Sequence, residues 1–269
     1  MSIGTATKIR NATLGLDHPL CHPWEDVRFR CVIFDCDSTL CAIEGIQVLG
    51  AAHQDEIARL TKSAMQGDTA LEDVYARRLS LARPARRDLD ALAERYVSTL
   101  VPDARDVVRA LDAEGIQVRI VSGGLKPAVL AVARALGVPD ERVAAVDVRL
   151  GDDGSYCGFD ETSPLARSGG KRAVIAAWQP PVPRPSMLVG DGATDLEARP
   201  AVDAFVAFAG VVRRKEVVDR ADRVIDGPSL APVVPLALGG APPRSSLARA
   251  VFDRGAALLA APSHDGSLS

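Results

Sequence analysis

The residues best suited to chemistry are acidic and hydroxyl side chains that directly follow short apolar runs. The run CVIF is followed by DCDST, QVRIV by SGG, and SMLV by GDGATD. The side chains that these segments contribute are Asp35, Asp37, Ser122, Asp191 and Asp195. If the runs are neighbouring parallel strands, which lie about 4.8 Å apart, their carboxyl ends gather four carboxylates and a hydroxyl in one small volume.

Such a group of carboxylates requires a cation, because several of them within a few ångströms do not all stay ionised alone. Oxygen ligands without nitrogen select Mg²⁺, which keeps several waters and binds one or two carboxylates together with phosphate oxygen. We therefore expect a phosphate ester as substrate. Asp35 is the candidate nucleophile, which would form an aspartyl phosphate, and Asp37 is the candidate general acid and base. Asp191 is predicted to bind the metal, and Asp195 to support it from the outer shell.

Other residues could hold the phosphate. Ser122 offers a hydroxyl, and Gly123 and Gly124 let main-chain N–H groups approach an anion closely. Lys171, the last residue of the segment SGGK, adds a point charge at the start of a helix. This segment is not a P-loop, because Leu165 stands where the first glycine would be.

Each of these segments alone has a plainer explanation. Asp-x-Asp-x-Thr and Gly-Asp-Gly are common in turns and helix caps, and SGGK is also typical of a simple helix start. Their joint order, each directly after a predicted strand, favours one catalytic site over several unrelated turns.

The elements that would position these residues are near-continuous apolar runs separated by helical patterns. The predicted strands are 31–34, 117–121, 186–189, 204–207 and 223–225, and the predicted helices between them are 104–114, 126–136 and 171–178. Strands that are buried on both faces and alternate with helices are typical of a doubly wound, mainly parallel, Rossmann-like α/β sheet.

Two stretches interrupt this alternation. Residues 42–100 are far longer than a crossover needs and carry apolar residues at helical spacing, which predicts an inserted helical cap. Residues 144–160 predict a small β-hairpin flap around GDDGS. The remaining boundaries are an N-terminal arm at 1–26, a core domain at 27–41 and 101–238, and a flexible C-terminal tail at 239–269 with a short helix at 247–259.

The composition and net charge of the chain limit the classes of protein to which it could belong. The chain has 269 residues, of which 47% are hydrophobic and 25% charged, as is usual for a globular protein. A net charge of −3 gives no electrostatic reason to expect nucleic acid or a membrane as partner. Five cysteines without a C-x-x-C pair, and no apolar leader, favour a cytoplasmic protein. The group His18, Cys21 and His22 offers only three ligands and is interpreted as structural.

The motifs resemble those of the haloacid dehalogenase-like phosphatases, and within them the phosphoserine phosphatases. The matching segments are FDCDSTL, EGI, AMQG, ARRLSL, IVSGG, GFDETSP, SGGK and VGDGATDLEA, in that order and within residues 32–210. The resemblance implies that Asp35 is phosphorylated and that Asp37 is the acid and base. It also implies that one Mg²⁺ is held by Asp35, Asp191 and the main-chain carbonyl of Asp37, while Ser122 and Lys171 bind phosphate.

The resemblance also assigns the pocket for the rest of the substrate. Phosphoserine carries an ammonium and a carboxylate, so a closed pocket needs one buried anion and one buried cation. Glu44 matches the ammonium-binding glutamate, although an acidic residue at a helix start is an alternative. Arg78 matches the carboxylate-binding arginine, with a solvated arginine or its neighbour Arg77 as alternatives. Met65 resembles a pocket residue, for which core packing is an equal explanation, and the role of Thr194 is left open.

The predicted function is Mg²⁺-dependent hydrolysis of L-phosphoserine to L-serine and phosphate. Another small phosphomonoester, or transfer of the phosphoryl group to an alcohol, is the enzymatic alternative. A non-catalytic receiver module is disfavoured because it has no helical cap. A homodimer is left open, and Cys36 and Cys41, beside the catalytic aspartates, are expected to be buried thiols, with inactivation by oxidation or alkylation as the alternative.

Overall fold

The computed structural model describes residues 26–50, 53, 55–57, 59–60 and 71–261. In this part of the chain the strands are β1 (Cys31–Phe34), β2 (Gln117–Leu125), β3 (Val143–Val146), β4 (Val148–Leu150), β5 (Tyr156–Phe159), β6 (Ser186–Gly190), β7 (Ala204–Phe208) and β8 (Arg223–Ile225). The α-helices are α1 (Gly45–Leu49), α3 (Leu71–Ala82), α4 (Arg86–Ser98), α5 (Ala104–Ala113), α6 (Lys126–Leu136), α7 (Gly170–Ala177), α8 (Ala193–Ala198), α9 (Lys215–Arg220), α10 (Val233–Ala237) and α11 (Ser246–Ala260). None of these described helices combines the length and apolarity needed to span a lipid bilayer.

A six-stranded sheet forms the centre of the molecule. Its order is β3-β2-β1-β6-β7-β8, and every neighbouring pair is parallel. The chain starts in the middle at β1, builds β2 and β3 on one side, and then returns to add β6, β7 and β8 on the other. This is the predicted doubly wound α/β fold, and its order changes direction between β1 and β6.

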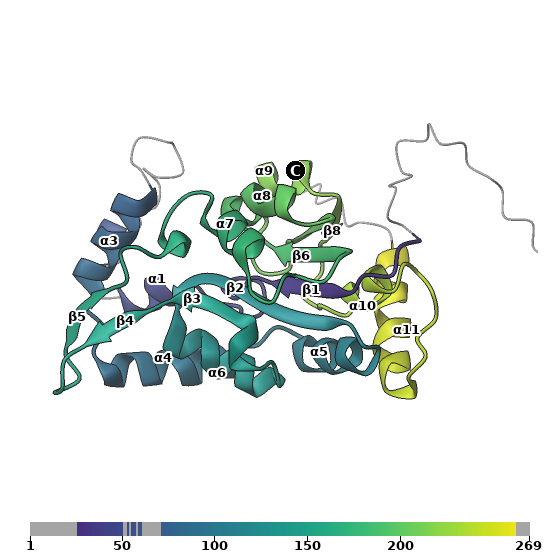
Figure 1. The fold of residues 1–269 in the computed structure, drawn as a ribbon, viewed down its shortest axis with the longest axis horizontal. Coiled ribbons are helices and arrows are strands. Elements are labelled where there is room, and N and C mark those ends of the chain that lie inside the picture. Colours follow the sequence, from purple (N-terminus) through teal and green to yellow (C-terminus); the bar gives the residue numbers. More distant parts are fainter. Residues whose placement is uncertain (1–25, 51–52, 54, 58, 61–70, 262–269) are drawn as a thin grey trace, which may run out of the picture.

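Helices cover both faces of the sheet (Figure 1). In β1 the side chains alternate: Val32 and Phe34 join the apolar cluster beneath α5 and α6, whereas Cys31 and Ile33 join the cluster beneath α7 and α8. Burial on both faces explains why the strand sequences are continuously apolar.

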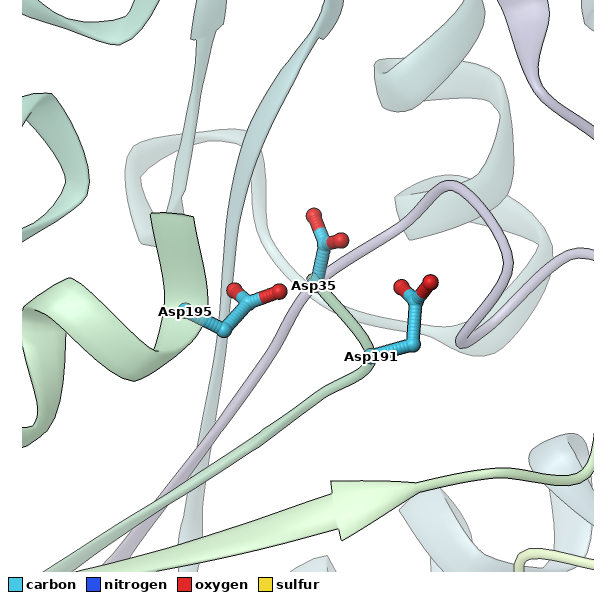
Figure 2. A group of neighbouring side chains, drawn as sticks. All are labelled: Asp35, Asp191 and Asp195. Carbon is cyan, nitrogen blue, oxygen red and sulfur yellow. The ribbon is translucent and has the colours of Figure 1, made fainter. Parts of the chain in front are cut away.

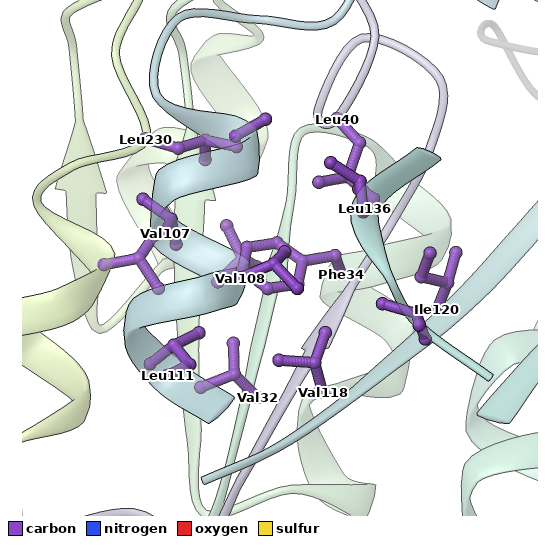
Figure 3. Close-up of a cluster of buried hydrophobic side chains, with 14 of the residues drawn as sticks. Val32, Phe34, Leu40, Val107, Val108, Leu111, Val118, Ile120, Leu136 and Leu230 are labelled. Carbon is purple, nitrogen blue, oxygen red and sulfur yellow. The ribbon is translucent and has the colours of Figure 1, made fainter. Parts of the chain in front are cut away.

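Helix α5 shows how spacing directs one of these helices onto the sheet. Val107, Val108 and Leu111 recur at three- and four-residue intervals and are buried against Val32 and Phe34 (Figure 3). Gly115 lies in the turn between α5 and β2. Its φ of +72° is unfavourable for residues with a Cβ atom.

The segment predicted as a cap contributes α1, α3 and α4 to the described residues. Helix α3 and the hairpin of β4 and β5 lie at one end of the sheet (Figure 1). Helix α4 instead runs along α6, and its Leu92 and Tyr96 belong to the apolar cluster of the core. The last helix of the predicted cap is therefore packed on the core domain.

The hairpin prediction is correct for its two strands but too wide. Residues 144–146 belong to β3, which extends the main sheet beside β2. Strand β2 is also longer than predicted, because Ser122 to Leu125 continue it through an irregular register. The short length of β3, with one partly exposed residue, made its membership of the large sheet hard to predict from sequence.

The segment from residue 239 differs from the expected flexible tail. Its predicted helix is present as α11, which packs against α5 and α10 with Ala248 and Val251 buried. Glu114, at the end of α5, accepts hydrogen bonds from Arg28 Nη2 (2.7 Å) and from the Ser245 main-chain N–H (2.7 Å). These contacts join both ends of the described chain to the core.

We predict that Leu111→Ala lowers the free energy of unfolding by about 2–5 kcal/mol, because it leaves a cavity between α5 and the sheet. Leu258→Ala is the matched control, since Leu258 is 44% exposed and lies on a helix as well. Denaturant unfolding of both variants measures the difference. Equal stability of the two variants would contradict the role of α5 in the core.

Candidate active site

The carboxyl ends of β1 and β6 bring three aspartates together. Asp35 follows β1, Asp191 follows β6, and the two strands pair directly through Phe34 and Val189. Carboxylate oxygens of Asp35, Asp191 and Asp195 lie within 4.8 Å of one another, and all three side chains are buried (Figure 2). Buried carboxylate oxygens this close together could hold a divalent cation.

Asp195 is held in place by two hydrogen-bond donors. It is on the first turn of α8, where its Oδ2 accepts a hydrogen bond from the Gly192 main-chain N–H (3.0 Å) and its Oδ1 from Lys171 Nζ (2.7 Å). A Cβ at position 190 would lie 2.2 Å from Asp195 Cγ, so Gly190 is required for this approach. Because both oxygens already have donors, Asp195 is better suited to orienting Lys171 than to binding a metal.

Lys171 is the buried cation of the site. It lies at the start of α7, is 5% exposed, and places Nζ 2.7 Å from Asp35 Oδ1 as well as from Asp195. Burial opposes its charge, but the carboxylates of Asp195 and Asp35 raise the pKa of Lys171 above its ordinary value. It therefore stays charged, ready to bind an anion beside Asp35.

The positive charge of Lys171 alone does not keep the Asp35 carboxyl ionised. Burial, together with the charge of Asp195, raises the pKa of Asp35 from 3.8 to about 8, and Lys171 opposes that rise only in part. At neutral pH the isolated site thus favours a protonated Asp35. A divalent cation held beside Asp35 would add positive charge and would favour the ionised form of its carboxyl group.

Asp37 lies two residues further along the same loop, where it is held from two sides. Its Oδ1 accepts hydrogen bonds from the Tyr96 hydroxyl (2.5 Å) and the Gly45 main-chain N–H (2.6 Å). Its Oδ2 lies 3.4 Å from Ser122 Oγ, which in turn accepts a hydrogen bond from the Gly124 N–H (2.9 Å). Burial and the nearby Glu44 raise the pKa of Asp37 despite these donors.

A cavity of about 340 Å³ opens above these groups. It collects most of the residues predicted from the sequence, which are Asp35, Asp37, Glu44, Arg78, Gly123, Lys171, Asp191 and Thr194. Ser122 and Asp195 are fully buried beside it. Met65, like the group His18, Cys21 and His22, falls outside the described residues.

Glu44 and Arg78 bring opposite charges to the cavity. Glu44 precedes α1, and its Oε1 accepts a hydrogen bond from Ser38 Oγ (2.8 Å). Arg78 lies on α3, and its Nε is buried without a hydrogen-bond partner in the described part of the chain. Burial lowers the pKa of Arg78, and Glu44 opposes that effect.

Arg77 points elsewhere and pairs with Glu56 (2.9 Å). This contact resolves the choice between the two arginines in favour of Arg78 as the cavity residue.

Sequence reasoning missed Arg214 and Tyr96. Arg214, just before α9, forms an ion pair with Asp191 and another with Glu44 (3.3 Å), so it adds a cation to the cavity rim. Its neighbour Arg213 pairs with Asp226 instead, and no local pattern distinguishes the two arginines. Tyr96 stands at helical spacing within the predicted cap, and that spacing gave no sign of its contact with Asp37.

Cys36 and Cys41 are both fully buried free thiols, with their sulfurs 4.0 Å apart. The contact with Cys41, together with burial, raises the pKa of the Cys36 thiol well above its usual range. A protonated, buried thiol is a poor nucleophile, which agrees with the expectation of structural cysteines.

Known proteins resemble this chain over most of the residues that form the site. A family model described as haloacid dehalogenase-like hydrolase matches residues 29–203. The chain belongs to the haloacid dehalogenase-like hydrolases. This hydrolase is 38% identical over 194 residues to the phosphoserine phosphatase of Bos taurus, a match that covers 71% of this chain and 86% of the relative. It is 39% identical to that of Drosophila melanogaster, over 71% of this chain and 72% of the relative. Within the hydrolases it therefore belongs to the phosphoserine phosphatase family.

Solved structures resemble this hydrolase in fold as well. A phosphoserine phosphohydrolase-like protein from Francisella tularensis matches with a TM-score of 0.67 and 25% identity, over 74% of this chain and 95% of that one. A substrate-bound phosphoserine phosphatase matches with a TM-score of 0.64 and 25% identity, over 76% of this chain and 96% of that one.

We predict that Mg²⁺ binds more tightly as the pH rises towards about 8. Below the raised pKa of Asp35 a proton competes with the cation, so the dissociation constant should fall by up to about tenfold per pH unit between about pH 6 and 8. The same shift makes the metal-free protein less stable as pH rises from about 4 to about 8, because only the unfolded carboxyl ionises in that range.

Isothermal titration calorimetry at several pH values, in buffers of different ionisation enthalpy, measures both the affinity and the protons released. Asp35→Asn is the control and should give weak binding without the pH dependence. A wild-type affinity that does not change with pH would contradict the argument.

Proposed function

We propose that this hydrolase converts L-phosphoserine to L-serine and phosphate through a phosphorylated Asp35. The observation that carries the proposal is the cavity, in which a carboxylate nucleophile beside a buried lysine faces one acidic and one basic side chain, Glu44 and Arg78. The names of the relatives support the same substrate.

The phosphoryl group of the substrate would lie between Asp35 and the donors around it. The donors would be Lys171 Nζ, the main chain at Gly123 and the Ser122 hydroxyl, which is buried beside the cavity. The buried acidic group fits Mg²⁺ in its oxygen ligands, and Asp35, Asp191 and the main-chain carbonyl of Asp37 would hold the ion. When bound, Mg²⁺ neutralises charge on the carboxylates and on the transferred phosphoryl group.

Two half-reactions follow from this arrangement. In the first, an Asp35 oxygen forms a bond to phosphorus while the bond from phosphorus to the serine oxygen breaks, and Asp37 gives its proton to that oxygen. In the second, water attacks phosphorus and Asp37 takes the proton, so the bond to Asp35 breaks and phosphate leaves. Asp37 returns to its protonated state and Asp35 to its carboxylate.

The rest of the substrate would be selected by charge. Glu44 would bind the ammonium, and the Arg78 guanidinium would bind the carboxylate in a bidentate contact. The buried Nε of Arg78 has no acceptor among the described residues, so a substrate carboxylate would satisfy it. Thr194 lies at the cavity and is a further candidate contact, as is Met65 on the basis of the resemblance.

A cytoplasmic location is the final part of the proposal. Cys31, Cys36, Cys41 and Cys157 are free thiols, which favours a reducing compartment.

The decisive test is a steady-state screen of small phosphomonoesters with and without Mg²⁺. We expect phosphoserine to have the highest kcat/KM, with equal amounts of serine and phosphate released in the presence of Mg²⁺. Asp35→Asn should abolish turnover and keep the fold, as judged by circular dichroism. Appreciable turnover by this variant would identify another nucleophile, and serine release without matching phosphate would indicate a transferase.

We further predict that Arg78→Ala raises KM for phosphoserine by about tenfold or more, because a charged hydrogen-bond pair to the carboxylate is lost. KM for 4-nitrophenyl phosphate, which has no carboxylate, should change much less. Arg77→Ala is the matched control, because Arg77 is exposed and pairs with Glu56 outside the cavity. Equal effects of Arg78→Ala on both substrates would refute the assignment.

A further inference from the structure

Tyr96 contacts the catalytic loop from a helix that carries none of the recognised motifs. Its side chain is fully buried on α4, and its hydroxyl donates a hydrogen bond of 2.5 Å to Asp37 Oδ1. The ring packs in the apolar cluster that α4 shares with α6. A phenylalanine would fill the same space, so the hydroxyl is the part of this side chain that core packing does not explain.

Gly45 supplies a second donor to the same oxygen, next to the Tyr96 hydroxyl. Its main-chain N–H donates to Asp37 Oδ1 at 2.6 Å. A Cβ at this position would lie 2.1 Å from the Tyr96 hydroxyl oxygen, so the loop and the phenol fit together only with glycine at position 45. Two donors, one from α4 and one from the start of α1, thus fix the same carboxylate oxygen.

This pair of donors distinguishes the two oxygens of Asp37. Oδ1 is occupied by two donors. A proton on it would force the Tyr96 hydroxyl to turn from donor to acceptor and would face the Gly45 N–H, which cannot accept a hydrogen bond. Oδ2 lies towards Ser122 Oγ (3.4 Å) and towards Gly124, which lines the cavity. When Asp37 carries a proton, Oδ2 is therefore the oxygen that holds it on the cavity side.

We propose that Tyr96 is a positioning residue, whose hydroxyl fixes the Asp37 carboxyl so that Oδ2 delivers the proton to the leaving oxygen. The inference deepens the proposed function and rests on its assignment of Asp37 as the general acid. Without the hydroxyl, Gly45 alone holds Oδ1 and the carboxyl is free to rotate away from the leaving group. Tyr96 then affects the first half-reaction in proportion to how much the leaving group needs a proton.

The test compares Tyr96→Phe on phosphoserine and on acetyl phosphate. Serine leaves as an alkoxide unless it is protonated, whereas acetate leaves readily as an anion. We expect kcat/KM for phosphoserine to fall about ten- to a hundredfold, and that for acetyl phosphate to change by less than about twofold. Tyr156→Phe removes a phenol hydroxyl from β5 outside the cavity and should leave the ratio of the two values unchanged.

The ratio of the two kcat/KM values is measured on one preparation, so any inactive fraction cancels. A fall that is equal for both substrates, or no fall for either, would overturn the role of Tyr96. A wild-type protein that hydrolyses other phosphomonoesters and not phosphoserine would instead refute the proposed substrate. The Tyr96 comparison would then be made with the best alkyl phosphate from the screen, and the same two outcomes would decide it.

Discussion

Crowding of buried negative charge at the ends of β1 and β6 is the constraint on which the site depends. Asp35, Asp191 and Asp195 lie together with Lys171 as the buried lysine among them. Burial, together with the charge of Asp195, raises the pKa of Asp35 above its ordinary value, and Lys171 opposes that rise only in part. A buried group of this kind would be stabilised by a divalent cation, whose charge would offset that of the carboxylates and of a phosphate ester beside them.

The sheet supplies this arrangement because of where its order changes direction. β1 and β6 are adjacent in space although about 150 residues separate them in sequence, and their parallel pairing places Asp35 and Asp191 at the same edge. Apolar burial of both sheet faces fixes the strands, so the aspartates are held by rigid elements.

Helices from the inserted segment complete the site from the other side. Arg78 on α3 reaches the cavity, and the Tyr75 hydroxyl, also on α3, donates to the Gly123 carbonyl (2.8 Å) at the end of β2. Tyr96 on α4 reaches Asp37. The insertion thus contacts both the cavity and the loop that carries Asp35 and Asp37.

The sequence by itself determined the local features: the buried strands other than β3, most helices, and the acidic side chains that follow β1 and β6. Apolar runs and turn residues are local signals, so they are readable without a structure. Only the tertiary structure decided that residues 143–146 join the main sheet, that α4 packs on α6, that Arg78 rather than Arg77 lines the cavity, and that Arg214 and Tyr96 also contact the site. Those contacts join residues far apart in the chain, and their geometry follows from packing that no local pattern encodes.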